Sequence, residues 1–104
     1  MKPITRRPKA VEDVESHAMY IADGSIDAAL RFLERAEQTI KGLAMLPESG
    51  GPFATSVPEL AGLRTRLVKD FSNHVVFYIE REDSIEVVRV LRGGQHMDVE
   101  ITKS

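Results

Sequence analysis

"HVVFYIEREDSIEVVRVLRGG", residues 74–94, contains two β-rich runs separated by three polar residues. Residues 74–81 and 85–91 are dense in β-branched and aromatic side chains, and the polar residues between them predict a hairpin turn. Both runs are apolar on both faces near their centres, which is typical of strands covered on each side. They predict the central hairpin of a sheet, ended by a turn at Gly93 and Gly94.

Further elements precede this hairpin. Residues 63–71 alternate polar and apolar side chains with a period of two and predict another strand, and residues 4–7 predict a short N-terminal one. Across residues 9–46 apolar side chains recur every three or four positions, which predicts two helices separated at Asp23–Gly24, with Ser25 as the second N-cap. The order β-α-α-β-β-β predicts an α+β fold with a mostly antiparallel sheet and a helical hairpin packed on one face.

The second helix and the segment after it carry the residues that we expect to face the core. Its apolar stripe comprises Ile26, Ala29, Leu30, Leu33, Ala36, Ile40, Leu43 and Ala44. Residues 47–62 are rich in Pro, Gly and Ser and predict an irregular loop, held to the body by Phe53, Val57 and Leu60. The helical hairpin can cover only one face of the sheet. Something else must therefore cover the other face, at least in part, and we expect this face to be exposed in the free protein as a recognition surface that a partner occupies.

Composition limits the class of protein. The 104 residues predict a single domain over residues 1–104, 42% of them are hydrophobic, and the formal net charge is −2. The slight acidic excess argues against broad nucleic-acid binding, and we expect no direct sequence-specific contact with nucleic acid. The chain has no cysteine, no signal-like apolar run and no stretch of membrane-spanning length, so we expect a cytoplasmic protein that does not enter a membrane.

Basic residues stand out around the last predicted strand. Arg89 interrupts an apolar run and Arg92 follows at its exit, while Arg64 and Arg66 share one face of another strand. One interpretation is that they are solvated or paired with Glu80, Glu86 and Asp70. The other is that they face an acidic, amphipathic partner segment, and the amount of uncovered apolar strand surface favours this interpretation.

The histidines and glycines give little indication of catalysis. His96, close to Arg92, could act as a general base, but a surface histidine in a mobile tail is the interpretation we favour. No two histidines have the spacing of a metal site, and Gly93–Gly94 lacks the helix start and the Gly-Lys-Ser/Thr of a phosphate-binding loop. We expect neither a metal nor a cofactor.

The chain resembles the ParE toxins of the RelE/ParE toxin–antitoxin superfamily. "SIDAALRFLERAEQTIKGLAMLPESG" (residues 25–50) is similar to their second helix and its exit, "GLRTRLV" (residues 62–68) to their Gly-Leu-Arg strand entry, and "HVVFYIEREDSIEVVRVLRGGQ" (residues 74–95) to their last hairpin. The pieces occur in the same order and spacing over nearly the whole chain.

The resemblance implies one of two activities. RelE-type members cut messenger RNA in the ribosome with two arginines and a terminal tyrosine or histidine, whereas ParE-type members trap the cleaved-DNA complex of DNA gyrase. Where the RelE pattern has these groups, this sequence has Val75, Gly94 and Glu100. Neither valine nor glycine can stabilise a developing phosphorane, which disfavours the nuclease.

The resemblance therefore implies a gyrase-inhibiting toxin without catalytic residues, neutralised by a cognate ParD-like antitoxin in a hetero-oligomer. Two alternatives stay open: a ribosome-dependent endonuclease with rearranged groups, and a degenerate toxin that acts only with its antitoxin as co-repressor. Residues expected to bind the target are Arg64, Arg66, Lys69, Arg89, Arg92 and His96. Residues expected to bind the antitoxin are Val76, Tyr78, Val88, Val90 and Leu91.

Overall fold

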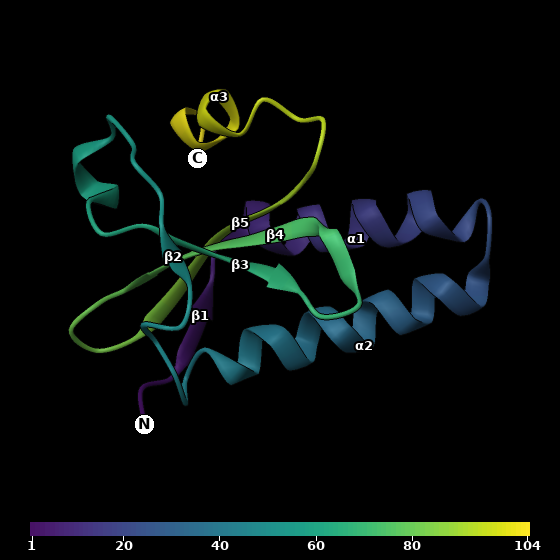
Figure 1. Cartoon of the computed structure of the whole chain (residues 1–104), viewed down its shortest axis with the longest axis horizontal. Coiled ribbons are helices and arrows are strands. Elements are labelled where there is room, and N and C mark those ends of the chain that lie inside the picture. The colour runs from purple at the N-terminus through teal and green to yellow at the C-terminus, as the bar shows by residue number, and fades with distance from the viewer.

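A five-stranded sheet in the order β1-β5-β4-β3-β2 forms the centre of the computed structural model, which describes residues 1–104 (Figure 1). β1 runs parallel to β5, and all the other neighbours are antiparallel. The predicted α+β class with a mostly antiparallel sheet is confirmed. The strands are β1 (Ile4–Arg6), β2 (Gly51–Pro52), β3 (Arg64–Val68), β4 (Phe71–Glu80) and β5 (Ile85–Arg92).

Two long helices, α1 (Pro8–Ala22) and α2 (Ile26–Gly42), form the expected antiparallel hairpin. α1 begins at Pro8, whose fixed φ and missing N–H suit the first helical position. At the start of α2 the Ser25 hydroxyl accepts the Ala28 N–H at 3.1 Å, so the predicted N-cap is confirmed. The hairpin covers one side of the sheet and extends past its end (Figure 1).

The core beneath the hairpin is narrower than the predicted apolar stripe. Ala29, Ala36, Ile40 and Leu43 are buried as expected, together with Phe32 and Thr39. Three members of the stripe are instead exposed, because they lie about a quarter turn away from the core-facing side of α2: Ile26 is 68% exposed, Leu30 60% and Leu33 39%. The hairpin therefore presents a second, outward-facing row of apolar side chains.

The opposite side of the sheet is not open, so that expectation is wrong. A C-terminal helix, α3 (Met97–Thr102), and a 3₁₀ turn, η1 (Pro58–Leu60), pack there, and α3 and α2 lie on opposite sides of the sheet (Figure 1). A second core forms between them and the strands. Its fully buried members are Leu60, Leu63, Phe77, Ile79, Val88, Leu91 and Ile101, and Phe53 and Val57 pack against it as predicted.

Tyr78 in β4 fixes the path of the long loop between α2 and β3. Its buried hydroxyl donates to the Pro47 carbonyl and accepts the Gly50 N–H, both at 2.8 Å. A Cβ on Gly50 would overlap this hydroxyl and the Thr65 carbonyl, so only glycine fits. The loop is thereby brought alongside β3, where Gly51 and Pro52 form the two-residue strand β2.

Candidate functional site

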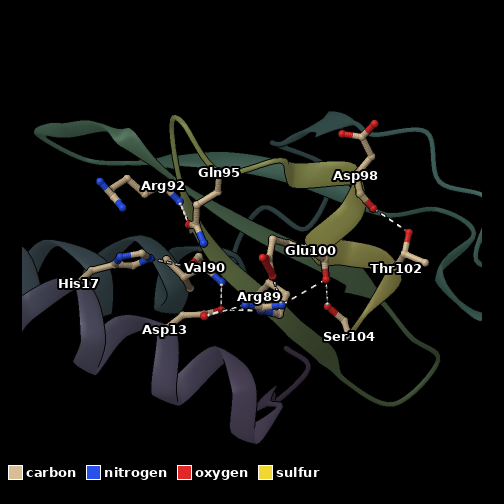
Figure 2. A network of polar contacts seen from close by, with 10 residues as sticks. All are labelled: Asp13, His17, Arg89, Val90, Arg92, Gln95, Asp98, Glu100, Thr102 and Ser104. Atoms are coloured by element: carbon tan, nitrogen blue, oxygen red, sulfur yellow. Dashed lines mark hydrogen bonds and ion pairs between the residues drawn. The ribbon is translucent and has the colours of Figure 1, made fainter.

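A short segment, residues 92–96, leads from the end of β5 back over the sheet to α3 and is called the C-terminal arm below. Gly94 has a φ of 95°, which glycine adopts without steric cost, and Gly93 packs against the side chain of Asn73, which would have to move to admit a Cβ there. The Gly93 N–H donates to the Asn73 carbonyl at 2.7 Å, and the Arg92 N–H donates to Gln95 Oε1 at 2.6 Å. The predicted turn at 93–94 is therefore present, and it directs α3 onto the sheet (Figure 2).

Arg89 forms the most buried ion pair of the chain. Its Nε and Nη2 donate to the two Asp13 carboxylate oxygens at 2.7 and 2.9 Å, and Asp13 Oδ2 also accepts the Val90 N–H at 3.0 Å. Arg89 Nη1 donates to the Glu100 carbonyl at 3.2 Å and lies 3.5 Å from its carboxylate. The hydrogen bond to Asp13 raises the pKa of Arg89. This guanidinium thus joins α1, β5 and α3 (Figure 2).

The expectation that Arg89 faces a partner does not fit this geometry. Its side chain is 6% exposed, and every strong contact it makes is internal. The alternative, pairing with Glu80, Glu86 or Asp70, is also wrong. Asp13 is 76 residues away in the chain, and only the packing of α1 on β5 brings the two groups together.

Two histidines lie in an aromatic cluster beneath the hairpin. His17 Nε2 is 2.8 Å from the Val90 carbonyl and therefore donates to it. The ring of His74 lies 5.0 Å from His17 and 4.7 Å from Phe32, and its Nδ1 is buried without a hydrogen-bond partner. Burial, with added repulsion from His17 and Arg92, lowers the pKa of His74 to about 4. His74 is therefore neutral at pH 7.

The remaining cations lie in two groups separated by β4. Arg66 and Lys69 are exposed at β3 and form no ion pair, while Arg64 donates to the Gly50 carbonyl at 2.8 Å and holds the loop. On the C-terminal arm, the Arg92 guanidinium lies 5.1 Å from the centre of the Tyr20 ring, as expected for a cation–π contact. The six residues expected to bind the target therefore do not form one cluster.

His96 is exposed and precedes α3, so it lies at the surface as expected. It stands at the N-terminus of α3, a helix that the sequence had not predicted. No group of three or more His, Asp or Glu side chains is arranged to hold a metal ion. No helix combines the length and apolar character needed to cross a membrane.

Comparison with known proteins identifies the family. The sequence model of the ParE toxin of the type II toxin–antitoxin system parDE matches residues 4–97. The chain belongs to the ParE toxin family. A comparison with curated proteins found no match.

Two solved structures are similar to this ParE-family chain. A chain of the chromosomal ParDE toxin–antitoxin system from P. aeruginosa matches at 19% identity and a TM-score of 0.71, over 89% of this chain and 97% of that one. The conserved hypothetical protein HP0894 from Helicobacter pylori matches at 11% identity and a TM-score of 0.49, over 95% and 99% of the two chains. The first of these supports the fold.

The five residues expected to bind the antitoxin are all buried in this ParE-family chain. Val76, Tyr78 and Val90 belong to the core beneath the hairpin. Val88 and Leu91 belong to the core beneath α3. They therefore lie on both sides of the sheet instead of sharing an open one, and a partner could reach them only if the hairpin or α3 moved away.

Sequence reasoning missed three residues that shape this region: Asp13, Glu100 and Ile101. The four-residue spacing of Met97 and Ile101, with Asp98 and Glu100 in the first turn, is a weak helix signal that was available. No signal indicated Asp13, which looks like any other acidic residue on a solvated helix. The buried pairing of Arg89 is therefore a finding of the structure alone.

Proposed function

We propose that this type II toxin inhibits DNA gyrase by binding and trapping its cleaved-DNA complex in the cytoplasm, and that a cognate antitoxin neutralises it. The toxin would act by recognition and not by its own chemistry. Its partners would be gyrase during poisoning and the antitoxin at rest.

The observation that carries the proposal is the lack of an assembled nuclease centre. At the three positions where the RelE pattern places catalytic groups, Val75 is apolar and packs against the core beneath α3, and Gly94 has no side chain. Glu100 is engaged by Arg89. The cations of β3 and of the C-terminal arm are separated by β4. An RNA phosphate would not meet a base and a cationic clamp together.

The antitoxin part of the proposal is supported by the outer surface of the hairpin. Met19 and Tyr20 of α1 are 73% and 67% exposed, and the outward row of α2, Ile26, Leu30 and Leu33, adds further apolar area. Apolar side chains gathered on one element are typical of a surface that a partner covers. The match to a chain of a ParDE system fits the same interpretation.

The test is induction of the toxin alone in cells, followed by scoring of DNA breaks and messenger RNA integrity. The proposal predicts DNA damage and filamentation with intact transcripts, and purified toxin should make gyrase accumulate cleaved DNA. Transcript cleavage at ribosomes with gyrase unaffected would overturn it. If neither responds while the antitoxin still binds, the chain is a degenerate toxin that acts only in the complex.

A further inference from the structure

Strand β3 has an unpaired edge over part of its length. On one side it pairs with β4, from Arg64 opposite Tyr78 to Leu67 opposite Val75, and the register then shifts so that Val68 lies opposite Phe71. On the other side its only neighbour is β2, whose two residues lie opposite Arg64 and Thr65. The stretch Arg66–Val68 therefore has no strand beside it on the side away from β4. Such an edge is a template for a further strand unless something covers it.

The backbone of Leu67 faces this open edge. The Leu63 carbonyl accepts a hydrogen bond from Phe53 N–H at 2.9 Å, so it points toward β2. Backbone groups alternate in direction along a strand, so those of Thr65 and Leu67 point the same way. Two residues further on, the Lys69 N–H is bonded at 3.1 Å to the Thr39 hydroxyl of α2. The open stretch of β3 therefore ends before Lys69, whose N–H is occupied by Thr39. Within the stretch, the N–H and C=O of Leu67 are free to pair with an added strand.

A groove of about 430 Å³ runs along this edge, between β3 and the second half of α2. Its walls carry Arg66 on the strand, Lys69 just after it and Gln38 on the helix. Neither cation has a carboxylate partner, in contrast to Arg35 nearby, which pairs with Asp70 at 2.7 Å. Leu67, which also lines the groove, is 54% exposed. The site offers two positive charges, two backbone hydrogen bonds and one apolar contact.

We propose that an extended, acidic segment of the antitoxin adds to the sheet as a strand at Arg66–Val68. This inference rests on the proposed function, because it names the site at which the antitoxin is held. Side chains of an added strand alternate between the two faces, so acidic residues would face Arg66 and apolar residues would face Leu67. Pairing of two toxin copies here is disfavoured, since it would bring Arg66 and Lys69 of each copy together.

The test uses full-length toxin and the antitoxin encoded beside its gene, with affinity measured by titration calorimetry. Leu67→Pro removes the outward N–H without removing a hydrogen bond to β4, and Leu67→Ala removes the side chain alone. The double change Arg66→Glu/Lys69→Glu reverses the charge of the groove. We expect about tenfold weaker binding or more for Leu67→Pro and for the charge reversal. The matched control is Lys9→Glu on α1, exposed and without an ion pair, which should bind as wild type.

Amide hydrogen exchange of the unmodified toxin gives a second measurement that needs no variant. The Leu67 amide should exchange fast in the free toxin and become protected in the complex. The strand-addition site is overturned if the Leu67 amide still exchanges fast in the complex, or if the antitoxin binds both Leu67→Pro and Arg66→Glu/Lys69→Glu as tightly as wild type. The proposed function stands in either case. Failure of the antitoxin to bind at all removes the proposed partner and this site with it. A toxin dimer that Leu67→Pro abolishes would show that a second copy occupies the edge, which also overturns the inference.

Discussion

The two sides of the sheet are covered in different ways. On one side α1 and α2 supply two long helices whose apolar side chains recur over about nine helical turns in total. On the other side the cover consists of a single 3₁₀ turn and the six-residue α3. Each of these pieces depends on very few contacts: Leu60 for the turn, and Ile101 with the Arg89–Glu100 contact for the helix.

This difference suggests how stability is distributed. A face held by a long helical hairpin loses its cover only by global unfolding, whereas a face held by a short terminal helix can open locally at a lower free energy. Arg89 connects the two sides, because its guanidinium contacts both Asp13 of α1 and Glu100 of α3.

The largest expected effect comes from breaking the buried ion pair. Arg89→Ala leaves the Asp13 carboxylate without its cation, and removing one partner of a buried pair typically costs about 3–5 kcal/mol of unfolding free energy. Urea denaturation would measure the loss. Replacing both partners together, as in Asp13→Asn/Arg89→Met, keeps an acceptor for the Val90 N–H and should restore most of it. A loss below about 1 kcal/mol for Arg89→Ala would show that the two sides are not connected through this residue.

The second prediction compares one core residue on each side. Ile40→Ala and Ile101→Ala each empty a fully buried site, for which a cost of about 2–5 kcal/mol is typical. Ile40→Ala should act through global stability. Ile101→Ala should mainly release α3, so trypsin should cleave at Arg92 while β4 and β5 keep their slow amide exchange. Equal proteolytic protection of the two variants would contradict the idea that the α3 side opens locally.

A third expected effect is a loss of stability at low pH, and it tests the side of the sheet that the helical hairpin covers. The pKa of His74 is about 4 in the folded chain against 6.5 for a free histidine, so the unfolded chain binds the extra proton between these values. Stability should therefore be complete above about pH 6.5 and fall by about 3 kcal/mol as the pH approaches 4, with about 2 kcal/mol lost by pH 5.

His74→Phe keeps an aromatic ring beside Phe32 and cannot titrate, so its stability should stay nearly flat between pH 7 and pH 5. Denaturant titrations at several pH values would measure both chains. The carboxylates whose pKa is lowered, such as Glu37 beside Arg6, lose their contribution only further into acid. An equal slope for His74→Phe and wild type in this window would show that His74 is not the group responsible.

The same asymmetry explains what the sequence could and could not predict. The helical hairpin and the succession of the longer strands along the chain follow from local periodicity, which repeats over many residues and survives small errors in boundaries. Ile26, Leu30 and Leu33 were misassigned because apolar spacing does not distinguish a core-facing stripe from a second, exposed stripe. The helix α3 on the other side of the sheet was not predicted, because its six residues are too few to show a helical repeat of apolar side chains.

The candidate site was less predictable than the fold, for a physical reason. Arg89 and Arg92 have similar sequence surroundings, since both follow apolar residues of the last predicted strand. In the structure, Arg89 is buried against Asp13, whereas Arg92 lies over Tyr20 at the surface. Their fates depend on which groups α1 presents along β5, and this is a contact between segments more than 70 residues apart. The sequence could therefore identify arginines that are candidates for binding a partner. Only the packing of the folded chain distinguishes an arginine that holds the fold together from one that is free to contact a partner.

The last prediction uses that separation to test the proposed target. Arg92 has no carboxylate partner and is held over Tyr20 by a cation–π contact, so it is available to a partner that desolvates it. An arginine at the centre of an interface commonly contributes about 2 kcal/mol, which is more than tenfold in binding. Arg92→Ala should therefore weaken the accumulation of gyrase-cleaved DNA at a given toxin concentration by more than about tenfold, with thermal stability nearly unchanged.

His96→Ala is the matched comparison, since His96 is exposed on the same arm and has no assigned proton-transfer role. It should change gyrase poisoning little, and Tyr20→Ala should fall between the two because it removes only the platform beneath Arg92. The nuclease alternative predicts the opposite order, with His96 required for transcript cleavage and Arg92 secondary. Ribosome-dependent cleavage that disappears in His96→Ala, with gyrase unaffected in every variant, would exclude the gyrase mechanism and identify the C-terminal arm as a catalytic element.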